Sequence, residues 1–339
     1  MIAQAASDSR PFNARFVEAM CRRRGWNFSD LDGGAGYLFA VTAGDRRVLC
    51  GSGAICAYPG NAASAYTIAR DKAFTHAALS AAGLDSVPTE LVFLEAARRH
   101  LRAPGREASD WLARATTLDF PLFAKPNRGA HGDFAERIED ADALADYFTR
   151  AARRHDQVVI QPLIDAPEYR VFVSGGRACF QYRKSDGGLV GDGVASWRAL
   201  FEAMNAELAA EALSPVPAAV FTGALVKAGI RADERAGIGQ RLALPGRRNL
   251  ASGAQTEAFS QSIEPELARL ALAAAAAIGL DVAGIDLFCA EGGAAHILEV
   301  NANPSFASLE TLGELDLAQE IWDDILARAL GEGEREEWR

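Results

Sequence analysis

Residues 284–301 read GIDLFCAEGGAAHILEVN, two mostly apolar runs separated by Gly292-Gly293. A two-residue glycine turn between such runs predicts a β-hairpin. In that register Asp286 lies opposite Glu299, and because side chains alternate along a strand, Asn301 shares the face of Glu299. Three oxygen-bearing side chains therefore converge on one face of the predicted hairpin.

Two carboxylates that face each other repel and destabilise a hairpin unless a proton or a cation lies between them. Mg²⁺ takes oxygen ligands and commonly keeps water and substrate phosphates in its remaining positions. We interpret Asp286, Glu299 and Asn301 as magnesium ligands, and we expect Asp286→Asn or Glu299→Gln to leave the metal-free fold at least as stable. The alternative is a hydrated acidic surface, which the apolar pattern leaves open because Phe288 and Ile297 fall on the carboxylate face.

Lysine is scarce in this chain, so each lysine is informative. Of the 35 Lys and Arg residues only four are lysines, at positions 72, 125, 184 and 227. Lys125 ends an apolar run and precedes the loop Asn127-Arg-Gly-Ala-His-Gly132. An ammonium beside a glycine loop can surround a polyphosphate with positive charge and backbone N–H groups. By itself the loop is a weak signal, because glycine loops join strands in many proteins without binding anything.

A second hairpin is predicted around Gly175-Gly176. Its register places Glu168 opposite Arg183 and Arg170 opposite Gln181, so that Glu168, Arg170 and Arg183 project from one face. The simplest explanation of this arrangement is a cross-strand salt bridge, which contributes little to stability.

Composition limits the class of protein and of partner. The 339 residues are 49% hydrophobic and 24% charged, as in soluble globular proteins of two or three domains. The net charge of −10 argues against a nucleic-acid partner bound through a broad basic surface. The five cysteines include no C-x-x-C pair, so we interpret them as reduced packing residues. We find no signal-like segment or apolar run of membrane-spanning length, and we expect a cytoplasmic protein that binds neither membrane nor nucleic acid.

Helices and strands alternate along the rest of the chain. Strands are expected at 90–94, 121–126, 133–138 and 158–164, and helices at 13–24, 62–82, 142–154, 197–212 and 266–278. Five consecutive alanines, Ala273–Ala277, indicate that the last of these helices packs closely on a sheet. The pattern is a mixed α+β and α/β one.

Taken in order, these segments resemble the ATP-grasp superfamily, and within it the ligase module of cyanophycin synthetases and bifunctional glutathione synthetases. The resemblance runs from about Ser64 to Leu309 and rests on short motifs in the family's order. They are Ile68-Ala-Arg-Asp-Lys72, Phe123-Ala-Lys-Pro126 with the glycine loop, Gln161 to Arg170, Val190-Gly-Asp-Gly193, Asn249-Leu250 with Gly253, Gly284-Ile-Asp286 and Glu299-Val-Asn301. The chain departs from the family at Pro304-Ser305, where the family usually has Pro-Gly, and the roles of Arg247-Arg248 stay open.

The resemblance implies an ATP-grasp fold of mixed α+β and α/β class. The ATP site would lie between two α+β subdomains, preceded by a small N-terminal α/β domain. We expect an N-terminal domain over 1–66, a subdomain with the glycine loop over 67–164, a C-terminal subdomain with the metal site over 165–330, and a charged tail over 331–339.

The resemblance also implies roles for individual residues. Lysines would contact the ATP phosphates, the glycine loop would cover them, one strand end would bind the adenine and Glu168 the ribose. These ATP-binding residues would be Lys72, Lys125, Arg128, Gly129, His131, Gly132, Gln161, Leu163, Ile164 and Glu168. Asp286, Glu299 and Asn301 would bind Mg²⁺, in agreement with the register of the hairpin. Arg170 and Arg183 would stabilise the transferring phosphoryl group or the acyl phosphate.

The implied function is that of an ATP-dependent carboxylate–amine ligase. Such an enzyme forms an amide or peptide bond on a small molecule through an acyl phosphate and releases ADP and phosphate. Its substrates would be a small carboxylate and an amine, amino acids among them, and a homodimer is one option because many relatives are dimers. Two alternatives remain: an ATP-grasp kinase of a small molecule, and a non-catalytic ATP-binding regulatory module.

Overall fold

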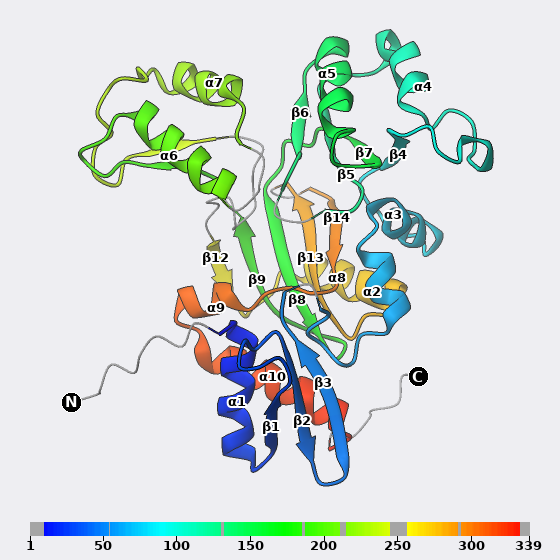
Figure 1. The fold of residues 1–339 in the computed structure, drawn as a ribbon, viewed down its shortest axis with the longest axis vertical. Coiled ribbons are helices and arrows are strands. Elements are labelled where there is room, and N and C mark those ends of the chain that lie inside the picture. The colour runs from blue at the N-terminus through cyan, green and yellow to red at the C-terminus, as the bar shows by residue number, and fades with distance from the viewer. Residues whose placement is uncertain are drawn as a thin grey trace.

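The computed structural model describes residues 10–53, 55–129, 132–184, 187–210, 215–244, 256–290 and 293–332. Within these ranges the chain forms a four-stranded and a five-stranded antiparallel sheet, a three-stranded sheet near the N-terminus and a two-stranded ribbon (Figure 1). Across the same residues, no helix combines the length and the apolar character that crossing a membrane requires.

The N-terminal unit is a three-stranded antiparallel sheet that packs with helices from opposite ends of the chain. Its elements are α1 (Phe12–Arg24), β1 (Asn27–Asp30), β2 (Leu38–Ala43) and β3 (Arg46–Gly51), joined by α9 (Ala307–Leu312) and α10 (Leu315–Leu330). Figure 1 shows α10 beside α1 and the sheet, and Trp322 of α10 shares one core with Met20 and Phe39. The C-terminal helix therefore completes the N-terminal unit.

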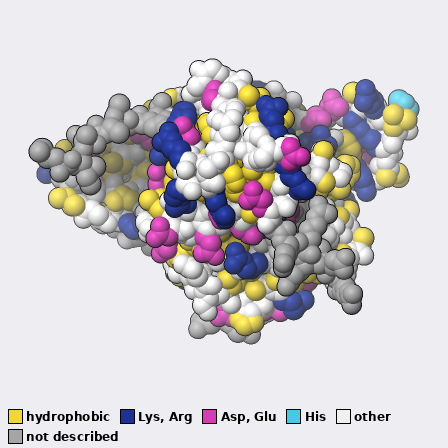
Figure 2. Space-filling view, turned by 90° about the horizontal axis from the view of Figure 1, so that it is seen from below, with side chains coloured by type: hydrophobic (Ala, Val, Ile, Leu, Met, Phe, Trp, Pro, Cys, Tyr) yellow, Lys and Arg dark blue, Asp and Glu magenta, His cyan; other side chains and the backbone are white. Residues whose placement is uncertain are grey.

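The surface near this end of the molecule mixes both signs of charge. Figure 2 shows basic and acidic side chains interspersed on the face seen from below. Ion pairs such as that between Arg24 of α1 and Asp323 of α10 belong to this mixture.

The four-stranded sheet has the strand order β4-β7-β5-β6. Its strands are β4 (Glu90–Phe93), β5 (Leu122–Pro126), β6 (Glu136–Ile138) and β7 (Gln157–Pro162), accompanied by η1 (Arg99–Leu101), α4 (Ala108–Ala113), η2 (Ala115–Thr117) and α5 (Ala141–Ala151). Asp140 caps α5 by accepting the N–H of Ala143 at 2.8 Å. The apolar stripe of α5 buries Leu144 and Phe148 in the core of this sheet.

The five-stranded sheet has the order β12-β9-β8-β13-β14. Its strands are β8 (Glu168–Ser174), β9 (Arg177–Lys184), β12 (Thr256–Ser260), β13 (Val282–Cys289) and β14 (Ala295–Asn301). One face is covered by α8 (Pro265–Ile278), whose buried Ala271 and Ala274 share a core with Val171 and Ile285 of the sheet. The small alanine side chains allow the close packing that the alanine run predicts.

The helix expected over 62–82 is in fact two helices, α2 (Ala63–Ala69) and α3 (Lys72–Ala81). Asp71 has extended backbone angles, and its carboxylate accepts the N–H of Phe74 at 3.0 Å. An aspartate in this conformation starts a new helix and does not continue the old one. Lys72 therefore stands at the first position of α3.

A small separate unit projects from the end of the five-stranded sheet (Figure 1). It consists of β10 (Gly188–Val190), α6 (Trp197–Ala210), α7 (Ala218–Ala228) and β11 (Arg241–Ala243). Its core is its own, with Trp197, Phe201 and Phe221 buried together.

A register shift in the C-terminal hairpin lies between the turn and the predicted carboxylate pair. The pair Asp286–Glu299 is confirmed, but the register then shifts by one residue, so that Leu287 faces Ile297. The shift turns Ile297 into the core beneath the sheet, and it is buried there. The expectation that Ile297 shares the carboxylate face was therefore wrong, because an irregularity exchanges the faces of a strand.

The second hairpin also contains a register shift, and here it changes the predicted pairs. Cys179 of β9 has no partner in the ladder with β8. Both pairs expected near Glu168 were therefore wrong by one residue: Glu168 faces Lys184, and Arg170 faces Tyr182. A glycine turn determines the register of its strands only as far as the first bulge.

Candidate functional site

Seven charged side chains gather where the two large sheets meet. The positive residues are Lys72 at the start of α3, Lys125 in β5, Arg170 in β8 and Lys184 in β9, and the carboxylates are Glu168 in β8, Asp286 in β13 and Glu299 in β14. We call these seven residues the charged cluster. Three of the four lysines of the chain belong to it.

Asp286 is buried and accepts hydrogen bonds from three side chains. Its Oδ1 accepts from Arg170 Nε at 2.7 Å, and its Oδ2 accepts from Arg170 Nη2 at 2.7 Å and from Asn301 Nδ2 at 3.2 Å. Lys184 Nζ lies 2.9 Å from the same Oδ2. Burial alone would raise the pKa of Asp286, but Arg170 and Lys184 outweigh it and lower the pKa from 3.8 to about 2. Asp286 therefore stays ionised at neutral pH.

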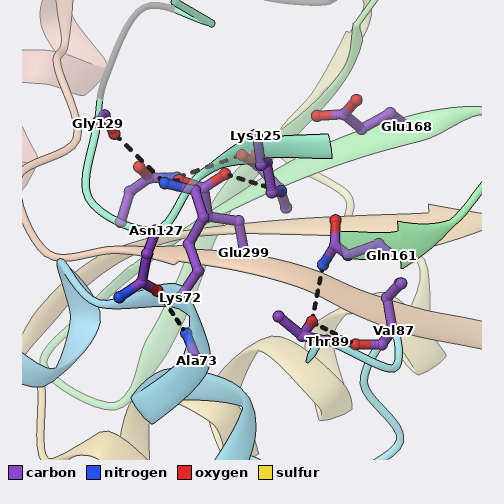
Figure 3. Close-up of polar contacts among 12 residues, drawn as sticks. Lys72, Ala73, Val87, Thr89, Lys125, Asn127, Gly129, Gln161, Glu168 and Glu299 are labelled. Atoms are coloured by element: carbon purple, nitrogen blue, oxygen red, sulfur yellow. Dashed lines mark hydrogen bonds and ion pairs between the residues drawn. The ribbon is translucent and has the colours of Figure 1, made fainter. Parts of the chain in front are cut away.

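Glu299 is the counter-ion of two lysines that come from different parts of the fold. Its carboxylate oxygens lie 3.7 Å from Lys72 Nζ and 3.8 Å from Lys125 Nζ (Figure 3). Burial alone would raise the pKa of Glu299, yet Lys72 and Lys125 lower it. Burial also lowers the pKa of Lys125, and Glu299 offsets only part of that effect. The cations that the facing carboxylates require are therefore side chains of the chain itself.

Lys184 is the cluster residue that sequence reasoning missed. Its Nζ donates to Glu168 Oε1 at 2.6 Å, and both side chains are buried. Burial and Arg170 would lower the pKa of Lys184, but Asp286 and Glu168 outweigh them and raise it. The scarcity of lysine singles this residue out in the sequence, but only the bulge shows that it points toward the cluster.

Arg183, which the sequence placed beside Arg170, lies outside the charged cluster. Its Nη2 donates to Glu257 Oε2 of β12 at 2.8 Å, and its side chain is 45% exposed. Successive side chains of a strand point to opposite faces. The one-residue shift in register therefore places Lys184, and not Arg183, opposite Glu168.

Arg128 and Gly129, the residues of the glycine loop that follow Asn127, lie against the start of α3. Arg128 Nε donates to Asp71 Oδ2 at 3.0 Å, and Lys72 Nζ donates to the carbonyl of Gly129 at 3.3 Å. Gly132 has a φ of 71°, which favours glycine. His131, also expected in the ATP site, lies outside the described residues.

The strand end expected to bind adenine connects the two large sheets. Gln161 near the end of β7 is buried, and its Nε2 donates to Thr89 Oγ1 at 2.8 Å (Figure 3). Leu163 and Ile164 follow, half-buried, in the short link to β8. All three residues therefore lie on the path from the sheet of Lys125 to the sheet of Glu168.

The predicted magnesium ligands lie together but are paired with cations of the chain. Asp286 and Glu299 offer carboxylates and Asn301 an amide, which is oxygen chemistry suited to Mg²⁺. Among the described residues, no group of three or more His, Cys, Asp and Glu side chains is arranged to hold a metal ion. The donor set therefore fits Mg²⁺ in chemistry. Binding requires the two lysines to leave Glu299, and Asp286 to share with the metal an oxygen that Arg170 or Lys184 now contacts.

Comparison with known sequences gives one domain match and short stretches of identity to named proteins. Residues 234–325 match the RimK-like ATP-grasp domain. A stretch of 79 residues is 42% identical to a probable alpha-L-glutamate ligase of Haemophilus influenzae, covering 23% of this chain and 25% of that protein. A stretch of 64 residues is 41% identical to a tetrahydromethanopterin:alpha-L-glutamate ligase of Methanococcus maripaludis, covering 19% and 22%. The matches thus span about a quarter of the length of these relatives.

Comparison with solved structures covers more of the chain. A bifunctional glutathione synthetase from Pasteurella multocida superposes on 94% of this chain and 44% of its own, with a TM-score of 0.54 and 16% identity. A D-alanine–D-alanine ligase from Bacillus anthracis covers 80% of this chain and 72% of its own, with a TM-score of 0.50 and 14% identity. The chain therefore has the ATP-grasp fold, and its residues 234–325 are similar to RimK-like ATP-grasp domains.

Proposed function

We propose that this protein is an ATP-dependent carboxylate–amine ligase that forms an amide or peptide bond on a small molecule. The observation that carries the proposal is the charged cluster, in which Lys72 and Lys125 converge on Glu299 from two parts of the fold. Four positive and three negative side chains leave the cluster with an excess of one positive charge. A site of this kind suits an anionic substrate such as ATP.

Lys72 and Lys125 are the residues proposed to bind the ATP phosphates. Their distances of 3.7 and 3.8 Å from Glu299 are ionic contacts longer than hydrogen bonds. Phosphate oxygens can therefore replace Glu299 at both ammonium groups and make the hydrogen bonds that Glu299 does not make. Arg128 and Gly129 of the glycine loop lie beside Lys72, and the loop is proposed to cover the phosphates.

Glu299, once freed from the lysines, would bind Mg²⁺ together with Asp286 and Asn301. Mg²⁺ bound there would neutralise charge on the phosphates during transfer. Arg170 keeps Asp286 ionised and oriented through two hydrogen bonds of 2.7 Å. Gln161, Leu163, Ile164 and Glu168 are proposed to hold the adenine and ribose, because they line the link between the two sheets.

The chemistry follows from the poor reactivity of a carboxylate. Its leaving group would be oxide, whereas transfer of the γ-phosphoryl group to the carboxylate gives an acyl phosphate from which an amine displaces phosphate. Lys72, Lys125, Lys184 and Arg170 would contribute by neutralising negative charge in a buried site, where such charges interact strongly. Arg183 has no part in this proposal because it is exposed and paired with Glu257.

The substrates are proposed from the named relatives. Because two matched relatives are named as alpha-L-glutamate ligases, L-glutamate is the first amine to test, followed by other amino acids. We further propose that the enzyme acts in the cytoplasm on small molecules, and that a homodimer is its assembly to test first.

Phosphate release from ATP tests the proposal over a matrix of carboxylic acids and amino acids, with mass spectrometry of each active pair. With the correct acid, ATP and Mg²⁺ but no amine, hydroxylamine should capture the acyl phosphate as a hydroxamate. Lys125→Met should abolish capture, whereas Lys227→Met on α7 should not. A stable phosphate ester with no hydroxamate and no amide would point instead to a kinase and refute the ligase.

A further inference from the structure

Asn127 joins the two elements that carry Lys72 and Lys125. It follows the last residue of β5 and is fully buried. Its backbone carbonyl accepts the N–H of Lys72 at 3.2 Å, and its side-chain Oδ1 accepts the N–H of Ala73 at 3.0 Å (Figure 3). The start of α3 is therefore bonded directly to the end of β5.

The bonds from Asn127 complete the N-terminus of α3. A helix leaves its first four N–H groups without partners inside the helix. In α3 these are the N–H groups of Asp71, Lys72, Ala73 and Phe74. The Ile68 carbonyl accepts the first, the Asp71 carboxylate accepts that of Phe74, and Asn127 accepts the other two. Half of the helix start is therefore held by a residue of another element, far from α3 in the sequence.

Gln157 fixes the orientation of the Asn127 side-chain amide. Asn127 Nδ2 donates to Gln157 Oε1 at 3.0 Å, and the backbone N–H of Asn127 donates to the carbonyl of Gln157 at 3.1 Å. Gln157 begins β7, the strand next to β5. These bonds leave the Asn127 Oδ1 only one orientation, toward α3.

The bonds from Asn127 to α3 matter because the ammonium groups of Lys72 and Lys125 repel each other. Lys72 lowers the pKa of Lys125 in addition to the effect of burial, and Glu299 is the carboxylate that contacts both ammonium groups. When phosphates replace Glu299, both lysines must already be at the correct separation, since a misplaced binding group loses the advantage of preorganisation. A flexible attachment of α3 would let Lys72 move away.

We propose that Asn127 is a positioning residue that holds Lys72 of α3 at the correct distance from Lys125 of β5 for phosphate binding. The proposal rests on the ATP site proposed above and adds to it a residue that does not touch ATP. Asn127 acts through the backbone of Lys72 and Ala73, and Gln157 orients its amide.

A double-mutant cycle with Lys72→Met tests this role, with the affinity for MgATP measured by titration calorimetry. Asn127→Ala should raise the Kd about tenfold, as the loss of a fixed hydrogen bond and of preorganisation predicts. In the Lys72→Met background the same substitution should change the Kd less than about twofold, because the lysine that Asn127 positions is gone. Equal weakening in both backgrounds would show a general structural role and overturn the proposal.

Asn205→Ala is the matched control. Asn205 also bridges backbone groups, accepting the N–H of Val216 at 2.7 Å and donating to its carbonyl at 3.2 Å, but in the separate small unit. Asn205→Ala should leave the Kd for MgATP unchanged.

If Asn127→Ala does not fold, Gln157→Ala removes only the bond that orients the Asn127 amide. It should raise the Kd about threefold, and again not in the Lys72→Met background.

The outcomes separate this proposal from the proposed function. Wild-type protein that binds MgATP, with Asn127→Ala and Gln157→Ala binding equally well, overturns the positioning role and leaves the ligase proposal standing. Wild-type protein that does not bind MgATP overturns both.

Discussion

Replacing Asp286 by asparagine should destabilise the protein even in the absence of metal and nucleotide. The predicted pairing of Asp286 with Glu299 suggests no loss of stability, because removing one of two opposed carboxylates relieves repulsion. In the structure Asp286 is instead the shared partner of Arg170 and Lys184, at 2.7 and 2.9 Å. Asparagine would leave the buried Lys184 and the half-buried Arg170 short of a counter-charge.

The magnitude follows from the pKa of Asp286, which the fold lowers from 3.8 to about 2. At more than about 1 kcal/mol per pKa unit, the ionised carboxylate contributes about 2 kcal/mol at pH 7. Asp286 is only 3% exposed, so solvent does not screen this contribution. We expect Asp286→Asn to lower the free energy of unfolding by about 3 kcal/mol, as other broken buried pairs do.

Urea unfolding of wild type and Asp286→Asn at a series of pH values measures the effect. Because Asp286 is more acidic in the folded than in the unfolded protein, its contribution is complete above about pH 4 and is lost as the pH falls toward 2. The difference between the two proteins should therefore shrink below pH 4. Glu257→Gln, which breaks the exposed pair with Arg183, should cost less than about 1 kcal/mol. A variant at Asp286 as stable as wild type at pH 7 would refute the reasoning.

Three further predictions concern the charged cluster. Lys184→Met should lower the free energy of unfolding by more than about 2 kcal/mol, whereas Arg183→Met should change it by less than about 0.5 kcal/mol, as urea unfolding will show. Lys125→Ala should weaken MgATP binding more than about tenfold in calorimetry, because a buried ammonium is lost from the phosphate site, while Lys227→Ala should bind normally. Mg²⁺ alone should not raise the melting temperature, because Lys72 and Lys125 occupy Glu299, whereas MgATP should raise it. Equal shifts for Mg²⁺ alone and for MgATP would contradict the replacement of Glu299 by phosphate at the two lysines.

Local patterns were sufficient to identify the elements and the kind of chemistry. The predicted register places Asp286 opposite Glu299. That pair holds because the register shift between it and the turn offsets the one-residue difference that the pairs nearer the turn show from the predicted register. Lys125 at a strand end and the glycine loop after it are likewise local features, and the order of the short motifs indicated the ATP-grasp fold. Such features depend on a few neighbouring residues, which the sequence displays directly.

Interactions between distant segments were beyond the reach of these patterns. The unpaired Cys179 exchanges the faces of Arg183 and Lys184, because one extra residue in a strand reverses every side chain beyond it. Nothing near Asn127 in the sequence indicates that it binds the start of α3, since that bond needs β5 and α3 to be brought together by the core. Whether a charged residue is exposed or buried beside a partner depends on the tertiary structure, and so does its energetic importance.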